Sequence, residues 1–445
     1  MEPVASLPVA VIGAGPVGLA AVAHLEVRGV PFLLFEAGKT VAANILSWKH
    51  IRVFSPWRYN IDKAARQLLT ASQWQGPDDD GLPTGQELFD HYFKPFYELP
   101  FIKKYTLLNA KVLSVGRTNF DKMKTFNREK LPFVVQVLHN DEVKQFEVRA
   151  VIDATGTWNS PNPIGSGGVY AAGEVENNSK IFYGIPDILD VHAERYKNKS
   201  VVVVGSGHSS INAILELDKL KDKYPDTEIN WVLRKKKVQD VYGGQENDAL
   251  EARGALGIKI EELVNNDRVN VYTPFQIQQI LNKNGRLTII GFQGNQKFAL
   301  PAVDEIISNT GSRPDFSFIR EVRLNIDPSL ESVKEIADLI DPNIHSCGTV
   351  RPHGEKELRH PEKDFYIVGS KSYGRAPTFL MATGYEQVRS IVAAIDGDIE
   401  AALNVELDLP ETGVCSVDLS SASSCCGSEG VSQTKEKKVT AASCC

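Results

Sequence analysis

The feature that most constrains the fold is a short buried strand near the start of the chain that runs directly into a glycine-rich turn. Residues 8–12 are apolar and mostly β-branched, which is typical of a fully buried strand. The turn, residues 13–18, reads GAGPVG, and residues 19–28 carry apolar side chains at helical spacing. A second apolar run, residues 31–35, ends on Glu36. Strand, glycine turn, helix, strand and acid in this order predict a dinucleotide-binding unit.

Each glycine of this turn has its own physical role. Gly13 permits the tight turn, Gly15 lets a pyrophosphate approach the backbone, and Gly18 lets the helix pack closely on the strand. The pyrophosphate would lie on amides at the helix N-terminus, where the helix dipole is positive. Glu36 can accept hydrogen bonds from ribose hydroxyls. We therefore expect these four residues to bind a dinucleotide cofactor.

The next segment, residues 37–62, is rich in aromatic and polar side chains. Its two tryptophans, Trp48 and Trp57, could form an ordinary satellite core. We favour a wall for a flat ring system, because aromatic faces and arginine donors suit an isoalloxazine or its substrate. Trp48 is then a cofactor contact, and the candidate catalytic residues of the pocket are Arg52, Trp57 and Asn60.

A small antiparallel sheet is predicted next. Strand-like runs at residues 107–115, 133–138 and 143–149 are typical of a meander. They lead into residues 150–156, AVIDATG, a buried strand that ends in a turn of small residues. Residues 158–163, WNSPNP, then break the chain, as expected for a hinge between domains.

A second dinucleotide fingerprint begins with four valines at residues 201–204. The motif GSGHSS follows at residues 205–210, with a helix predicted over residues 211–220 and a strand over residues 228–233. Its last position, Ser210, is small enough for close packing of helix on strand. The candidate cofactor contacts of this unit are Gly205, Gly207, Ser209 and Ser210.

The two fingerprints differ in the charge that follows their second strand. The first ends on Glu36, whereas the second ends on the basic run 234–237. Basic groups can pair with a 2′-phosphate, so NADPH is favoured over NADH, with Arg234 and Lys235 as its contacts. The alternative is a solvated basic surface.

The rest of the chain repeats the first part. Residues 286–292 and 296–300 predict a second short meander, and residues 303–311 end in Asn-Thr-Gly where the earlier strand ends in Ala-Thr-Gly. Two nested units of this kind indicate an internal duplication. A late strand at residue 365, followed by a glycine turn and a helix, would complete the first unit and place Gly369 and Ser370 at its cofactor.

The predicted fold is therefore α/β, with two nested Rossmann-like domains that each carry a β-meander. Residues 1–160 and 312–405 are expected to form the first, discontinuous domain, and residues 161–311 the second. Residues 406–445 are Ser-rich and poor in large apolar groups, so we expect a flexible, disordered tail that contains cysteines.

Bulk properties exclude several classes of protein. A length of 445 residues suggests two or three domains, and a net charge of −7 argues against nucleic acid or an acidic membrane as partner. No apolar run is long enough to span a bilayer, and the first residues lack the pattern of a signal peptide. We expect a cytoplasmic protein with a small-molecule substrate, of unknown oligomeric state.

Taken together, these motifs resemble the flavoproteins with two dinucleotide-binding domains, and within them the flavin-containing monooxygenases. The resemblance rests on the first glycine turn, on ATGTW at residues 154–158, and on Phe182, Gly184 and His192 ahead of the second turn. The last group is similar to the phenylalanine–glycine–histidine signature of that family, but extra residues separate Gly184 from His192.

A closer likeness is to the flavin monooxygenases encoded in arsenic-resistance operons. It rests on SGHS at residues 206–209, KSYGRAP at residues 371–377 and the paired terminal cysteines. The resemblance implies FAD in the first domain, NADPH in the second, and oxidation of a soft nucleophile by dioxygen. A trivalent arsenical is the favoured substrate.

Five of the six cysteines lie near the C-terminus, and four of these form adjacent pairs. Neighbouring thiolates suit a soft ion of low coordination number, such as trivalent arsenic or mercury, better than tetrahedral zinc. We expect metalloid capture by the pairs, which are Cys425 with Cys426 and Cys444 with Cys445; Cys347 and Cys415 are further candidates. Incidental cysteines in a disordered tail are the alternative.

Two other functions stay open. A disulfide or metal-ion reductase of the same fold would pass electrons through a cysteine pair beside the flavin, but no CxxC or CxxxxC lies near either glycine turn, so it would have to use the tail. A metalloid-binding protein with a vestigial flavoprotein body is the third possibility, and two intact fingerprints argue against it.

Overall fold

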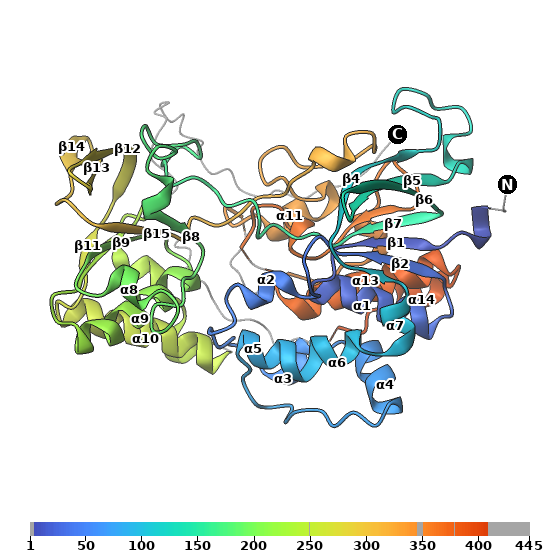
Figure 1. The fold of residues 1–445 in the computed structure, drawn as a ribbon, viewed down its shortest axis with the longest axis horizontal. Coiled ribbons are helices and arrows are strands. Elements are labelled where there is room, and N and C mark those ends of the chain that lie inside the picture. Colours follow the sequence, from blue (N-terminus) through green and yellow to red (C-terminus); the bar gives the residue numbers. More distant parts are fainter. Residues whose placement is uncertain (1–3, 249, 345–349, 378, 408–445) are drawn as a thin grey trace, which may run out of the picture.

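The computed structural model describes residues 4–248, 250–344, 350–377 and 379–407. Two lobes lie side by side, each built around its own parallel sheet (Figure 1). All six cysteines, and with them every predicted metalloid ligand, lie outside the described residues. Within the described ranges, no helix is long and apolar enough to cross a membrane.

The first lobe contains a five-stranded parallel sheet in the order β16-β7-β1-β2-β3. Its strands come from both ends of the chain, since β16, at residues 365–367, pairs with β7. The short apolar runs of this sheet are almost wholly buried, as expected for parallel strands covered on both faces. The bounds are β1 Val9–Ile12, β2 Phe32–Phe35, β3 Thr106–Leu107, β7 Ala150–Asp153 and β16 Phe365–Ile367.

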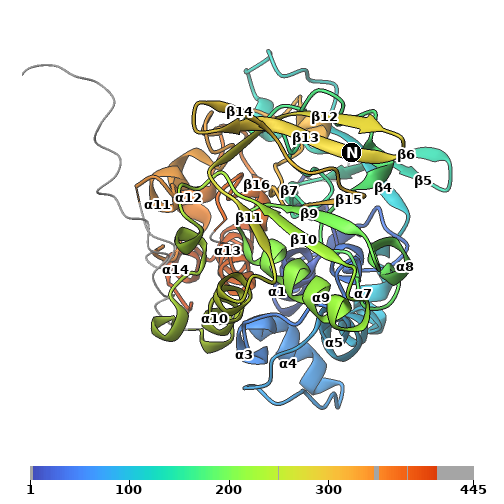
Figure 2. The same ribbon diagram turned by 90° about the vertical axis from the view of Figure 1, so that its left-hand side faces the viewer.

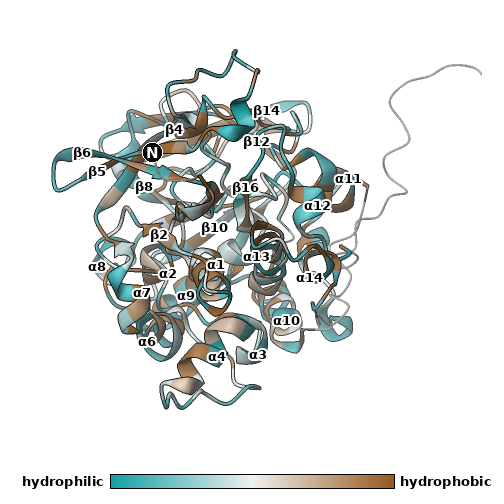
Figure 3. Ribbon diagram, turned by 90° about the vertical axis from the view of Figure 1, so that its right-hand side faces the viewer, coloured by the Kyte–Doolittle hydropathy of each residue, from teal (hydrophilic) through white to brown (hydrophobic). Residues whose placement is uncertain are grey.

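Helices cover one face of this sheet and an antiparallel meander covers the other (Figure 1). Helices α1 (Pro16–Val27) and α13 (Met381–Ile395) pack against each other below the strands. On the opposite face, the ring of Phe146 lies 5.1 Å from that of Phe35 in β2. The meander consists of β4 Ala110–Arg117, β5 Phe133–His139 and β6 Glu142–Val148. In Figure 3, the connection between β5 and β6 is hydrophilic where it projects from the lobe.

The second lobe repeats this plan with a parallel sheet in the order β11-β10-β9-β15-β8. Helices α9 (His208–Lys223) and α10 (Glu251–Asn265) cover one face, and a meander covers the other (Figure 2). The sheet strands are β8 Ile181–Tyr183, β9 Ser200–Val204, β10 Glu228–Val232, β11 Asn270–Tyr272 and β15 Glu305–Ser308. The meander strands are β12 Phe275–Lys283, β13 Arg286–Gln293 and β14 Gln296–Ala299.

The two sheets correspond strand by strand, which supports the predicted duplication. Strands β1, β2, β3 and β7 occupy the same places in the first sheet as β9, β10, β11 and β15 in the second. The fifth strand differs in its origin, since β16 follows the others in the chain whereas β8 precedes them. The α/β fold with two Rossmann-like units and two meanders is confirmed.

Several helices fall where the sequence predicted none. The segment predicted as an irregular aromatic loop contains α2 (Ala43–Leu46) and α3 (Trp57–Asn60). Beyond it, short helices continue as α4 Lys63–Ala71, α5 Gly85–Leu88, α6 Lys94–Tyr97 and α7 Pro100–Lys104. The remaining short helices are α8 Ala193–Tyr196, α11 Ala337–Ile340, α12 Glu355–Leu358 and α14 Ile399–Leu403. Strand β12 and helix α10 were likewise not predicted.

Candidate functional site

The first glycine turn connects β1 to α1 at the carboxyl end of the first sheet. Gly13 has a φ of +96°, and a Cβ atom there would lie 2.8 Å from the carbonyl oxygen of Ala154. A Cβ atom on Gly18 would lie only 1.8 Å from the carbonyl oxygen of Gly13. At Gly15, by contrast, a Cβ atom would meet nothing within 4 Å, so the backbone here faces open space. The turn thus leaves room for a ligand against the N-terminus of α1, as a pyrophosphate requires.

Glu36 links this turn by hydrogen bonds to the segment that follows β2. Its two carboxylate oxygens accept hydrogen bonds from the amides of Ala14 (2.7 Å) and Gly38 (2.6 Å). A carboxylate has about four lone-pair positions, so two remain for ribose hydroxyls. The side chain is half-buried at the carboxyl end of β2, next to the turn, where the fingerprint expects it.

Residues after β7 and β16 border the same turn. Gly369 has a φ of +69° and lies against Val17, with 3.2 Å between its notional Cβ and the valine methyl group. Its amide donates a 2.8 Å hydrogen bond to Gln387 of α13, and Ser370 lies beside Gly156. The structure therefore brings Gly369 and Ser370 to the first turn from more than 300 residues away in the chain.

A fully buried ion pair joins these two loops. The Nζ atom of Lys371 lies 2.7 Å from a carboxylate oxygen of Asp153, and both side chains have 0% exposure. Lys371 also donates to the hydroxyl of Thr155 at 3.1 Å and lies 4.5 Å above the ring of Phe318. Thr155 in turn donates both its amide and its hydroxyl to Asp153. Sequence reasoning missed this pair, because its two residues are 218 positions apart.

The second glycine turn connects β9 to α9 and has the same construction. Gly205 has a φ of +140°, and a Cβ atom there would lie 2.4 Å from the carbonyl oxygen of Asn309. At Gly207 a Cβ atom would again meet nothing within 4 Å. Ser210 is buried and donates to the carbonyl oxygen of Gly207 at 2.6 Å, while Ser209 is half-buried in the first turn of the helix. Both turns thus offer an open cradle of backbone at a helix N-terminus.

A cleft of about 400 Å³ lies at this second turn, and both lobes contribute to it. From the second lobe come the glycine turn, Arg234 and Asn309, and from the first come Ser370 and Arg375. The Oδ1 atom of Asn309 is buried without a hydrogen-bond partner, whereas its Nδ2 atom donates to Gly184 at 2.8 Å. An orphaned acceptor that borders a cleft fits a ligand that carries hydrogen-bond donors.

Asn309 is a functional candidate that sequence reasoning did not single out. The available signal was the parallel between Asn-Thr-Gly at residues 309–311 and Ala-Thr-Gly at residues 154–156. Arg375, which lines the cleft from the first lobe, was also missed as an individual residue.

The predicted NADPH contacts Arg234 and Lys235 follow β10, and of the two only Arg234 lines the cleft. Both are exposed, and Arg234 donates to the carbonyl oxygen of Ser166 at 3.3 Å. Among the described residues, Arg234 forms an ion pair with no carboxylate, so its charge is available to a phosphate. Lys235 accepts a hydrogen bond through its backbone carbonyl from Thr273.

The aromatic segment of the first lobe is arranged differently from the predicted wall. Trp57 is 5% exposed and contacts His91, and Trp48 packs on Gly85. The amide group of Asn60, 1% exposed, is fully engaged with Ser55 and Pro56 of its own segment. Arg52 is exposed and bonds to Leu82 and Glu87. None of Trp48, Arg52, Trp57 or Asn60 lines the cleft, so their assigned roles stay predictions.

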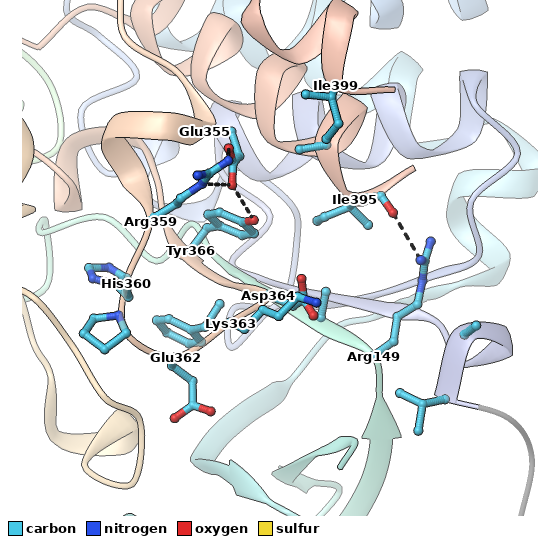
Figure 4. Close-up of a pocket in the computed structure, with 16 residues that line it drawn as sticks. Arg149, Glu355, Arg359, His360, Glu362, Lys363, Asp364, Tyr366, Ile395 and Ile399 are labelled. Carbon is cyan, nitrogen blue, oxygen red and sulfur yellow. Dashed lines mark hydrogen bonds and ion pairs between the residues drawn. The ribbon is translucent and has the colours of Figure 1, made fainter. Parts of the chain in front are cut away.

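Another cavity lies elsewhere in the first lobe. It measures about 700 Å³ and lies at the amino ends of β7 and β16, the opposite end of the sheet from the glycine turn. Some of its polar groups pair with one another: Glu355 binds Arg359 and the hydroxyl of Tyr366, and Arg149 donates to the carbonyl of Ile395 (Figure 4). Ligands of open parallel sheets bind at the carboxyl ends of the strands, so we assign the cofactors to the other end.

The described part of the chain lacks a cluster of metal-binding side chains. No group of three or more His, Cys, Asp or Glu side chains there could hold a metal ion. The described ranges also contain no cysteine.

Comparison with known proteins identifies the family. Residues 7–362 match the pyridine nucleotide-disulphide oxidoreductases. The ferredoxin–NADP reductase of Anaplasma phagocytophilum is 25% identical over 288 residues, which cover 64% of this chain and 67% of that protein.

Among solved structures, the bacillithiol disulfide reductase of Bacillus cereus is similar with a TM-score of 0.64 and 18% identity. The ornithine N-hydroxylase of Kutzneria sp. 744 is similar with a TM-score of 0.58 and 14% identity. Each alignment covers 88% of this chain and 99% of the other, and at these identities it informs on the fold alone. With most of its length matched, the chain belongs to the pyridine nucleotide-disulphide oxidoreductase family, whose members are flavin-dependent oxidoreductases that use FAD and NADP(H).

Proposed function

We propose that this protein is an NADPH-dependent flavin monooxygenase, with FAD in the lobe of residues 1–160 and 312–405 and NADPH in the lobe of residues 161–311. When bound, the two cofactors supply hydride transfer and the activation of dioxygen. The two open glycine cradles, and the cleft that both lobes line at the second of them, support this assignment of one dinucleotide to each lobe.

The observation that carries the choice of a monooxygenase is that no CxxC or CxxxxC pair of cysteines occurs near either glycine turn in the sequence. A reductase that relays electrons through its own disulfide needs two cysteines next to the flavin. Without such a relay, reducing equivalents pass directly from the flavin to a small acceptor, and dioxygen is small enough to reach it. The fold likeness to an ornithine N-hydroxylase agrees with this choice.

In the proposed mechanism, side chains and backbone amides of this chain bind the two cofactors and orient them. Backbone amides at the two helix N-termini hold the two pyrophosphates, and Glu36 accepts from ribose. Arg234 pairs with the 2′-phosphate of NADPH, and Asn309 offers its free acceptor oxygen to the part of NADPH in the cleft.

The proposed substrate is a soft nucleophile, specifically a trivalent arsenical that is oxidised to the pentavalent state. Support comes from the resemblance to monooxygenases of arsenic-resistance operons and from the terminal cysteine pairs, whose thiolates match a soft metalloid.

Oxygen uptake by the FAD-loaded protein with NADPH tests the proposal, with and without a trivalent arsenical. We expect uptake stimulated by the arsenical, together with a pentavalent product. Slow oxygen use that no arsenical stimulates would be consistent with a flavin enzyme but would refute the proposed arsenical substrate.

A reductase is the second candidate, because the matched family and the bacillithiol disulfide reductase fold both favour it. It would oxidise NADPH without oxygen while a disulfide or a metal ion is reduced. An anaerobic assay with these acceptors therefore separates the two functions.

Arg234→Ala is expected to raise the KM for NADPH by roughly 10-fold or more, since a charge-assisted hydrogen bond contributes about 1.5–3 kcal/mol. Use of NADH should stay nearly unaltered, because NADH lacks the 2′-phosphate. Steady-state kinetics with both nucleotides measure this. An equal loss for both would contradict the assignment of Arg234.

Replacing both Cys425 and Cys426 by serine is expected to weaken turnover at limiting arsenical while the FAD content stays unchanged. The physical reason is that serine hydroxyls bind soft metalloids poorly. Unchanged kinetics at limiting substrate would refute capture by this pair.

A further inference from the structure

We infer that Phe54 is a positioning residue that holds the NADPH lobe against the FAD lobe in the orientation needed for hydride transfer. The inference rests on the proposed function, in which NADPH in the second lobe reduces FAD in the first.

Phe54 belongs to the first lobe but makes its aromatic contacts with the second. Its ring lies 5.2 Å from the ring of His208, and the guanidinium carbon of Arg253 lies 5.8 Å from its centroid. His208 is the first residue of α9 and directly follows the glycine turn proposed for NADPH. Arg253 lies in the first turn of α10. The phenyl ring thus contacts the beginnings of two helices of the NADPH lobe.

The partners of Phe54 are themselves held in place. Arg253 forms a two-point ion pair with Asp248, at 2.7 and 2.8 Å, and the side chains are 10% and 5% exposed. Burial, followed by the nearby Arg253 charge, lowers the pKa of His208, so a neutral imidazole faces the phenyl ring at neutral pH. An aromatic pair of this kind contributes about 0.5–1.5 kcal/mol beyond its area burial.

A second contact comes from the same short segment. The Nε2 atom of His50 lies 3.7 Å from a carboxylate oxygen of Glu216, which also accepts from the amide of Ile188 at 3.4 Å. Positions 208 and 216 are eight apart on α9, so they lie on the same side of that helix. Residues 50–54 therefore contact α9 at two separate points along its length: the ring contact of Phe54 and the longer approach of His50, whose Nε2 atom forms no hydrogen bond among the described residues.

The segment is anchored firmly in its own lobe. The amide of Val53 donates to Pro83 at 2.9 Å, and the amide of Gly85 donates to Ile51 at 3.0 Å. Arg52 and Thr84 form an isolated antiparallel β-bridge between these two segments. The segment that carries Phe54 is thus held by backbone hydrogen bonds to its own lobe. The contact of Phe54 with His208 and Arg253 therefore constrains how the second lobe is oriented relative to the first.

Hydride transfer is sensitive to this orientation, because each lobe carries one of the two cofactors. Reacting atoms must come within about 3–3.5 Å, and a misplacement of about 1 Å can reduce the rate roughly 100-fold. The backbone of His208 belongs to the proposed pyrophosphate site, so its displacement would move the nucleotide with it.

Anaerobic stopped-flow reduction of the FAD-loaded protein by NADPH tests the inference. For Phe54→Ala we expect the limiting rate of flavin reduction to fall roughly 10- to 100-fold, with the Kd for NADPH changed less than about twofold. Phe54→Tyr, which keeps the ring, should restore the rate. Phe126→Ala is the matched control, since Phe126 is 84% exposed on the loop between β4 and β5.

Each result has a distinct meaning. A limiting rate equal to that of the wild type, or a raised Kd with an unchanged limiting rate, would overturn the role of Phe54 and leave the proposed function intact. Failure of NADPH to reduce the wild-type flavin would overturn both.

Discussion

Gly18→Ala is expected to produce a protein whose first lobe folds poorly and purifies without FAD. The new methyl carbon would lie 1.8 Å from the carbonyl oxygen of Gly13, and backbone atoms cannot move aside as a side chain can. Helix α1 would have to separate from β1, although both are almost wholly buried. Overpacking alone costs about 1–3 kcal/mol, and a clash with backbone costs more. The ratio of flavin absorbance to protein after gel filtration, together with the thermal unfolding midpoint, measures the effect.

Gly15→Ala is the matched control, because the same methyl group at this position meets no protein atom within 4 Å. Gly15 has φ −75° and ψ −176°, which alanine adopts without strain. We expect the apoprotein to unfold within about 3 °C of the wild type, since replacing glycine by alanine at a helix N-cap has a modest cost. Its affinity for FAD should nevertheless fall, because the methyl group points to where the pyrophosphate approaches. An affinity of Gly15→Ala for FAD equal to that of the wild type would contradict the proposed site.

The parts of the fold that could be predicted from the sequence are those specified by local motifs, such as the two glycine turns. The turns at residues 13–18 and 205–210 are local, and their strand, glycine and helix signals lie within about 30 residues of each other. The buried strands were predictable because continuous apolar runs have few alternatives in a chain with such turns. The residues 286–292 and 296–300 likewise predicted two strands of the second meander, without its first strand, β12.

Other elements depend on contacts that the local pattern does not contain. Helices α3 and α5 to α7 are only four or five residues long, so their apolar residues show no complete helical period. Strand β12 alternates between buried and exposed residues only over its first four positions, because a register shift between Ile277 and Gln279 interrupts the alternation. Tertiary pairing with β13 decides its structure.

The candidate site likewise depends on contacts between distant residues, which local sequence patterns do not predict. Residues that meet at the cleft come from positions near 160, 205, 309 and 370, and no local pattern connects them. The predicted wall of Arg52, Trp57 and Asn60 followed from composition, and it stays a prediction: Asn60 bonds within its own segment, whereas Arg52 bonds to Leu82 and Trp57 contacts His91. What the aromatic segment does contribute is Phe54, whose partners lie in the other lobe.

Lys371→Met is expected to lower the stability of the first lobe by about 3–5 kcal/mol, because removal of one partner leaves a buried charge without compensation. Asp153 is 0% exposed and would keep only its hydrogen bonds from Thr155. Since these residues border Gly156 and Ser370, we also expect a lower FAD content. Urea unfolding of the wild type and the variant, monitored by fluorescence, measures the change.

Two further variants separate the effect of burial from that of the ion pair itself. Lys334 and Asp327 form a pair with the same 2.7 Å distance, but Lys334 is 47% exposed, so Lys334→Met should change the unfolding midpoint little. Combining Lys371→Met with Asp153→Asn removes the uncompensated charge and should recover much of the lost stability, as replacement of a whole buried pair often does. Recovery of stability without recovery of FAD binding would mean that the charges themselves, and not only the packing of the two loops, support the cofactor. A loss equal to that of Lys334→Met would show that the buried pair contributes no more than a surface pair.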